Sequence, residues 1–181
     1  MKIKPTSKRG QVIVEMNRRD DQLLAASSRE AKSAPFKLKN ILVPIDFSDH
    51  SRKALQYALP FAEKYGAKII LLHVVEPRVY PENYFDVIIP AEMEQVNMEL
   101  AATARKQLGE WRRQEIDPKI AADSIVRIGK PYAEIINTAK ELDIDLIVIA
   151  THGYTGLKHV VLGSTAERVV RHAVCPVLTV R

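Results

Sequence analysis

Residues 145–167 read DLIVIATHGYTGLKHVVLGSTAE, and this stretch carries the strongest indication of the fold. It opens with a short apolar run that has no polar alternation, which is typical of a strand buried on both faces. A loop with three glycines follows, and the sequence STAE at 164–167 then has the S-x-x-E form of a capping box at a helix start. The stretch therefore predicts a strand, a long loop and a helix, which together form the repeating unit of an α/β domain.

The same alternation between strand-like and helix-like patterns recurs through the rest of the chain after residue 37. Apolar runs predict strands at 40–45, 67–74, 120–128, 145–150 and 176–180. Helical spacing predicts helices at 50–65, 91–115, 132–142 and from 164 onward. Such a string implies a doubly wound, Rossmann-like α/β fold, in which a five-stranded parallel sheet has helices on both faces.

The expected strand order is 3-2-1-4-5, in which the winding direction reverses between the first and the fourth strand. Ligands of doubly wound sheets bind outside the carboxyl ends of the strands at that reversal. The loops that meet there are 44–48 and 150–163. We therefore expect the functional site between these two loops.

Two of the expected helices carry a regular apolar pattern. In the first, Ala54, Ala58, Phe61 and Tyr65 recur at helical spacing up to Gly66, where a C-terminal cap is expected. The second is long, and one apolar stripe along it is expected to pack against the sheet. That stripe consists of Met93, Val96, Leu100, Ala104, Leu108 and Trp111.

The positive charge of the chain is concentrated at its N-terminal end. Residues 1–40 carry ten Lys or Arg against four Asp or Glu, whereas the remaining residues carry 17 against 18. We read residues 1–37 as a basic, mostly disordered extension and 38–181 as the domain. A neutral domain argues against nucleic acid as its partner, although the extension is either solvated or a mobile arm that contacts phosphate or anionic lipid.

The cysteine content and the apolar runs of the chain bear on its compartment. A single cysteine, Cys175, excludes an internal disulfide network and is expected to be an inert buried thiol. No apolar run approaches the length of a membrane span, and no secretory signal is recognisable at the N-terminus. We expect a cytoplasmic protein without a membrane partner.

Asp46 stands at the first of the two loops, between a buried strand and a helix. A carboxylate at this position can accept hydrogen bonds from sugar hydroxyls or a ring amine, or stand behind a divalent cation. It can equally serve as the N-terminal cap of the helix that follows. Its position alone leaves both interpretations open.

The second loop has the features of a phosphate site. Gly153 and Gly156 permit positive φ and close backbone approach, and Gly163 directly precedes the helix. A helix that opens with Ser164 and Thr165 presents free N–H groups, two hydroxyls and a positive dipole end to one small volume. An ordinary capping box is the alternative, but it leaves the three glycines unexplained.

Familiar nucleotide motifs are absent from the sequence. No lysine precedes Ser164 in a G-x-x-x-x-G-K-[ST] pattern, and no G-x-G-x-x-G follows the first strand. A P-loop NTPase and a dinucleotide-binding Rossmann domain are therefore not expected.

Residues 38–181 as a whole resemble the universal stress protein family. The resemblance rests on ILVPIDFSDHSRKALQYALPFA, on ILLHVVEP, and on the segment from IVRIGKPYAEII to ATHGYTGLKHVVLGSTAERVVRHAVCPVLTV. Nucleotide-binding members carry G-x-x-G-x9-G-[ST] after the fourth strand. In this sequence the nine-residue spacer between Gly153 and Gly163 fits, Ser164 fits, and Ala150 replaces the first glycine.

The resemblance implies an ATP site and assigns residues to it. The nucleotide would be held at its adenosine end by Asp46 and the backbone of Pro44 and Ile45, and Val74 would flank the adenine. The remaining implied residues face the phosphates or the same pocket: Gly129, Ala150, Gly153, Gly163, Ser164 and Thr165. His152 lies inside the same loop, where it either contacts a phosphate or packs within the loop. Mg²⁺ or Mn²⁺ would accompany the phosphates.

The implied function is an ATP-binding stress-response protein that acts through nucleotide-dependent conformation or partner choice. No nucleophile with a base and an orienting group can be recognised, so any enzymatic activity is expected to be at most slow ATP hydrolysis. The alternative is a nucleotide-independent dimeric interaction module of the same fold. The last strand should form a sheet edge, and the resemblance implies a homodimer through it.

Overall fold

The computed structural model describes residues 2–5, 12–15, 37–77, 90–152 and 162–181. The chain divides into two units, Met1–Phe36 and Lys37–Arg181. In the first unit, strands β1 (Lys2–Pro5) and β2 (Val12–Glu15) pair antiparallel. The sequence predicted that this extension is mostly disordered. Apart from β1 and β2, its residues lie outside the described ranges.

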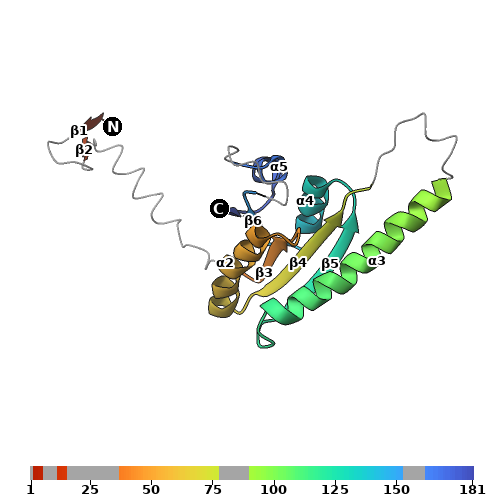
Figure 1. Ribbon diagram of the computed structural model, residues 1–181. Coiled ribbons are helices and arrows are strands. Elements are labelled where there is room, and N and C mark those ends of the chain that lie inside the picture. The colour runs from red at the N-terminus through yellow and green to blue at the C-terminus, as the bar shows by residue number, and fades with distance from the viewer. Residues whose placement is uncertain (1, 6–11, 16–36, 78–89, 153–161) are drawn as a thin grey trace. The chain divides into compact units, whose positions relative to one another are not determined.

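The second unit contains a five-stranded parallel sheet in the order β5-β4-β3-β6-β7 (Figure 1). Counted within this unit, that order is 3-2-1-4-5, which confirms the prediction. The strands also lie within two residues of their predicted positions. They are β3 (Asn40–Pro44), β4 (Lys68–Val75), β5 (Ala122–Ile128), β6 (Leu146–Ala150) and β7 (Val177–Val180).

Helices cover both faces of this sheet. Helices α2 (Asp49–Tyr65) and α3 (Pro90–Glu115) pack on one face, whereas α4 (Pro131–Glu141) and α5 (Ser164–His172) pack on the other. Alternate residues of each strand face opposite sides, so Ile41 and Val43 join the core under α2 and α3 while Leu42 joins the core under α4 and α5. A strand that is buried on both faces needs an uninterrupted apolar run, which explains the sequence pattern.

The central strands β3 and β6 are also joined at their starts by a side chain. The Asp145 carboxylate accepts hydrogen bonds from the backbone N–H groups of Lys39 and Asn40, at 2.7 and 2.9 Å. Hydrogen bonds to a charged acceptor are stronger than those between neutral groups. Asp145 therefore stabilises the alignment of the two strands between which the winding direction reverses.

Two features of the predicted helix faces differ from the structure. In α2, Ala54 and Ala58 are buried as the core face, but Phe61 and Tyr65 are 36% and 43% exposed. The buried face is instead centred on the side of the helix that holds Leu55 and Ala62, which lie about 60–120° around the axis from Phe61 and Tyr65. The spacing correctly identified a helix but not which side of it is buried.

Helix α3 is longer than the part of the sheet that it covers. Its buried residues Ala101, Ala104, Leu108 and Trp111 continue the predicted stripe, whereas Val96 and Leu100 are 45% and 38% exposed. Figure 1 shows the end of α3 nearest Pro90 projecting beyond the strands. Among the stripe residues whose burial is described, Ala104, Leu108 and Trp111 therefore pack as predicted.

The C-terminus of α2 provides a test of backbone conformation. Gly66 has φ of 65° and caps the helix in the left-handed region, and a Cβ there would meet nothing within 4 Å. Replacing Gly66 with Ala therefore adds backbone strain alone, and we expect the free energy of unfolding to fall by about 1–2 kcal/mol. Chemical denaturation followed by circular dichroism measures this change.

Gly109 offers a matched control, because it lies inside α3 and a Cβ there also meets nothing within 4 Å. Its replacement with Ala is expected to raise the free energy of unfolding by about 0.5–1 kcal/mol, since alanine favours the helix. Effects of the same sign at the two glycines would contradict this account.

Candidate functional site

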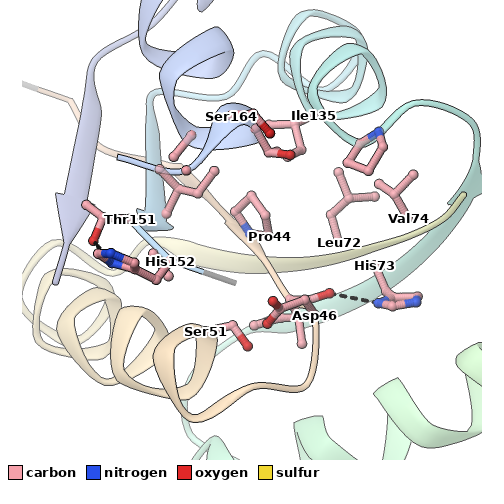
Figure 2. Close-up of a pocket in the computed structure, with 17 residues that line it drawn as sticks. Pro44, Asp46, Ser51, Leu72, His73, Val74, Ile135, Thr151, His152 and Ser164 are labelled. Atoms are coloured by element: carbon pink, nitrogen blue, oxygen red, sulfur yellow. Dashed lines mark hydrogen bonds between the residues drawn. The ribbon is translucent and has the colours of Figure 1, made fainter. Parts of the chain in front are cut away.

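A cavity of about 240 Å³ lies at the carboxyl edge of the sheet, where β3 and β6 meet (Figure 2). Its position is the one predicted from the winding reversal. Nine of the residues predicted from the sequence line this cavity. They are Pro44, Ile45, Asp46, Val74, Ala150, His152, Gly163, Ser164 and Thr165.

The two other predicted residues are not in that set of described lining residues. Gly153 lies outside the described residues. Gly129 has φ of 157°, and a Cβ on it would lie 2.8 Å from the Oε1 atom of Glu134. A turn between β5 and α4 with Glu134 packed over it accounts for glycine at position 129.

Asp46 is held by the residue that caps the next helix. Its Oδ1 atom accepts hydrogen bonds from the backbone N–H of Ser48 at 3.0 Å and from the Ser48 hydroxyl at 2.5 Å. Ser48 itself is the N-cap of α2, because its Oγ atom accepts from the N–H of Ser51. The alternative in which Asp46 caps α2 is therefore wrong, and its carboxylate is oriented in the cavity wall.

Phe47, between these two residues, has an unusual backbone conformation. Its φ is 64°, in the left-handed region that bulky side chains seldom adopt. Its ring packs against His73 at a centroid distance of 4.6 Å and edge-on against Trp111 at 5.8 Å. These contacts stabilise the strained conformation, which turns Asp46 toward the cavity and Ser48 toward the helix start.

His73 is a lining residue that the sequence did not identify as part of the site. Its Nδ1 atom is 2.8 Å from the carbonyl oxygen of Ile45, which ties β4 to the loop after β3 (Figure 2). The only sequence signal was a polar side chain near the carboxyl end of an apolar strand. His73 therefore holds both the Ile45 backbone and the Phe47 ring.

Much of the cavity wall is apolar. Leu72 and Val74 of β4 face the cavity from one side and Ile135 of α4 from another (Figure 2). The sequence predicted Leu72 only as a core residue and Ile135 only as helical. Leu72 lines the cavity because it lies near the carboxyl end of β4, beside the point where the winding direction reverses. The apolar pattern of one strand does not reveal this position.

Helix α5 points its N-terminus at the cavity, but not through the predicted capping box. Its N-cap is Gly163, no side-chain cap hydrogen bond is formed, and Ser164 is the first helical residue. The Glu167 carboxylate instead pairs with Arg171 at 2.6 Å, one turn further along. Without a side-chain cap, the first-turn N–H groups and the positive end of the helix dipole remain directed to the ligand side.

Position 163 requires glycine because its backbone lies very close to the backbone of Thr151. Its N–H donates to the carbonyl oxygen of Thr151 at 2.7 Å, and a Cβ on Gly163 would lie 3.0 Å from the same oxygen. The N–H of Thr151 in turn donates to Val180 of β7 at 2.8 Å. Glycine at this position thus allows the helix start to lie directly against the end of β6.

Ala150, which replaces a glycine of the family motif, is the last residue of β6 and pairs with Val180. It does not belong to the described residues with positive φ, so its backbone needs no glycine. Its methyl group packs partly against the core under α2 and α3. The structure therefore accommodates alanine at this position.

Charge is sparse around the cavity. Asp46 is the only Asp, Glu, Lys or Arg among the lining residues that the structure describes. Within the same described ranges, no group of three His, Cys, Asp or Glu is arranged to hold a metal ion.

Cys175 lies apart from the cavity, partly buried beneath α4 and α5. Burial raises the pKa of its thiol, and the nearby charge of Asp145 raises it further. A raised pKa keeps the thiol protonated and unreactive near neutral pH.

None of the described helices is long and apolar enough to cross a membrane.

Comparison with known proteins identifies relatives of the second unit. Residues 37–181 match the model of the universal stress protein family. Universal stress protein YxiE of Bacillus subtilis is 34% identical over 144 residues, which cover 78% of this chain and 97% of that protein.

Solved structures share the fold. The universal stress protein UspA from Lactobacillus plantarum has a TM-score of 0.69 at 28% identity, and the match covers 80% of this chain and 99% of that one. A universal stress protein solved in complex with cAMP has a TM-score of 0.54 at 21% identity and covers 80% of this chain and 98% of that one.

The close contact at Gly163 leads to a stability test. In Gly163→Ala the new methyl group must displace the Thr151 carbonyl or the start of α5, so we expect the free energy of unfolding to fall by about 1–3 kcal/mol. Ser164→Ala is the neighbouring control, because the exposed Ser164 side chain forms no cap bond, and its effect should stay within about 0.5 kcal/mol. Urea denaturation of both variants measures the difference, and equal effects would show that the contact is unimportant.

Proposed function

The chain belongs to the universal stress protein family, and from this premise we propose that its cavity binds an adenine nucleotide, with ATP as the ligand. One observation carries the proposal: a fixed carboxylate and an uncapped helix N-terminus line the same cavity. We propose that nucleotide occupancy alters the conformation or the partner choice of the protein in the response to stress.

The adenosine end would lie along β3 and β4. The Asp46 carboxylate is a hydrogen-bond acceptor and suits the ribose hydroxyls, which can donate to it. Leu72 and Val74 supply an apolar wall against which a flat base can pack. The backbone of Pro44 and Ile45 lies beside this wall and would supply further contacts.

The phosphate end would lie at the start of α5. First-turn N–H groups and the helix dipole favour an anion, and the Ser164 and Thr165 hydroxyls add donors. The relative solved with cAMP supports the proposal, because the same fold there holds an adenine nucleotide. Gly153 of the family motif belongs to the proposed site by its sequence position alone.

Binding, rather than rapid turnover, is the proposed activity. A divalent cation such as Mg²⁺ or Mn²⁺ would arrive with the nucleotide, since among the described lining residues Asp46 is the one carboxylate and phosphate oxygens would complete the coordination. We propose that hydrolysis, where it occurs, is slow.

We also propose a homodimer through β7, which is an edge strand of the sheet. Val170 of α5 and Val174, which lies between α5 and β7, are 48% and 60% exposed. A sheet edge is a surface that a second copy can cover, and the exposed apolar side chains of the preceding segment would add to it.

Isothermal titration of the full chain with ATP and Mg²⁺ tests the nucleotide proposal. Asp46→Asn keeps the shape of the side chain and removes its charge, so we expect ATP affinity to fall about tenfold. Asp49→Asn is the matched control, because the Asp49 side chain is 97% exposed and outside the cavity lining. An absence of binding at millimolar ATP, or equal affinities for both variants, would reject the proposal in favour of a nucleotide-independent module.

Thr179 provides the test of the dimer. The carbonyls of Pro176 and Val180 accept from β6, so by strand alternation the N–H of Thr179 points away from β6. Thr179→Pro should therefore prevent pairing at the free edge while preserving the β6–β7 ladder, whereas Thr179→Val should not. Sedimentation velocity is expected to show a dimer for the wild type and Thr179→Val and a monomer for Thr179→Pro; a monomeric wild type at micromolar concentration would contradict the proposal.

A further inference from the structure

We propose that His50 and His152 together form a second anion-binding point, which takes the outer phosphates of the nucleotide and makes the cavity prefer triphosphates to monophosphates. The inference rests on the proposed function and extends it to the choice among adenine nucleotides. It assigns to His50 a role that its place in the sequence did not indicate.

The two rings come together from opposite sides of the winding reversal. His50 lies in the first turn of α2, and His152 follows β6. Their ring centroids are 5.8 Å apart, with an angle of 36° between the ring planes. The pair thus bridges the same two segments, after β3 and after β6, that form the cavity.

This separation suits a shared oxyanion. An oxygen that accepts a hydrogen bond from an imidazole nitrogen lies about 4 Å from the ring centroid. Two centroids that are 5.8 Å apart can both lie about 4 Å from one oxygen atom. The lines from that oxygen to the two centroids then meet at about a right angle. A terminal phosphate, which has three such oxygens, can therefore contact both histidines.

His152 lines the cavity, and His50 lies beside it, outside the residues that line the cavity. The Nδ1 atom of His152 is 3.0 Å from the hydroxyl of Thr151, whose side chain points toward the ring (Figure 2). His50 is exposed, but its neighbour Ser51 is 2% exposed and anchored by a hydrogen bond from its hydroxyl to the Ser48 carbonyl. Ser51 and Thr151, the residues next to the two rings, are therefore held by hydrogen bonds, which lowers the entropic cost of binding an anion between the rings.

The charge of the lining explains why such a pair matters. Asp46 is the only described lining residue with a formal charge, and it is negative. The start of α5 supplies positive potential over roughly one turn, which is enough for one or two phosphates. Further phosphates extend toward the rim, where the described residues offer the imidazoles of His50 and His152 as donors.

Titration calorimetry of the full chain with ATP, ADP and AMP, at a fixed Mg²⁺ concentration, tests the inference. We expect the wild type to bind ATP more tightly than AMP. His50→Ala and His152→Ala should each lower the ratio of ATP to AMP affinity about tenfold, because each removes a donor to a charged phosphate. His50→Arg, which places a hydrogen-bond donor at the same position, should recover the ratio.

His172→Ala is the control, because His172 is exposed in the last turn of α5 and its Nδ1 atom is paired with the Arg168 carbonyl. This variant should leave the ratio unchanged, and thermal unfolding of all variants should confirm that they are folded. An unchanged ratio in both His50→Ala and His152→Ala, or an equal fall in His172→Ala, would overturn the inference while the proposed function stands. Absence of binding for all three nucleotides would overturn both.

Discussion

Parallel pairing between β3 and β6 is the constraint on which the rest of the second unit depends. The pairing aligns Ile41 with Leu146 and Leu42 with Ile147, across more than a hundred residues of intervening chain. The chain winds one way from β3 through β4 to β5 and must then return to the open side of β3 to place β6 and β7. Because the connections leave these two central strands in opposite directions, they separate at the carboxyl edge and leave a crevice.

Everything in the candidate site follows from that separation. The loop after β3 carries a carboxylate, and the loop after β6 returns to a helix whose N-terminus faces the same space. The two ends of the cavity therefore differ in electrostatic character: one accepts hydrogen bonds, and the other favours negative charge. A ligand with neutral hydroxyl donors at one end and an anion at the other matches this polarity, whereas the reverse orientation places its anion against Asp46.

The sequence predicted the features that depend on local pattern or on the resemblance. Apolar runs located the five strands of the parallel sheet, Gly66 marked the end of α2, and the family motif led to Gly163 and Ser164. The features that it missed depend on contacts between distant segments. The S-x-x-E pattern is compatible with a capping box, but the hydrogen bond from Gly163 to Thr151 moves the cap to the glycine and makes Ser164 helical.

The sequence also mispredicted which side chains of two helices are exposed, for a similar reason. Phe61 has the right spacing for a core residue, but α2 meets the sheet along the neighbouring side that contains Leu55 and Ala62. Val96 fits the stripe of α3, yet the sheet does not extend beneath it. Periodicity specifies a helix, whereas the width of the sheet and the rotation of the helix decide which residues are covered.

Phe47 has a further consequence for how the site responds to substitution. Its left-handed backbone sets the direction of Asp46, and its ring rests against Trp111, a residue of α3 outside the cavity lining. Trp111 also lies beneath the guanidinium of Arg52, at 5.3 Å from the ring centroid, so α2 and α3 share this contact. Energetic effects of residues joined by such contacts are not additive. The free energies of replacing Trp111 and Asp46 are therefore coupled, and a double-mutant cycle between them reports the rigidity of the loop that separates strand from helix.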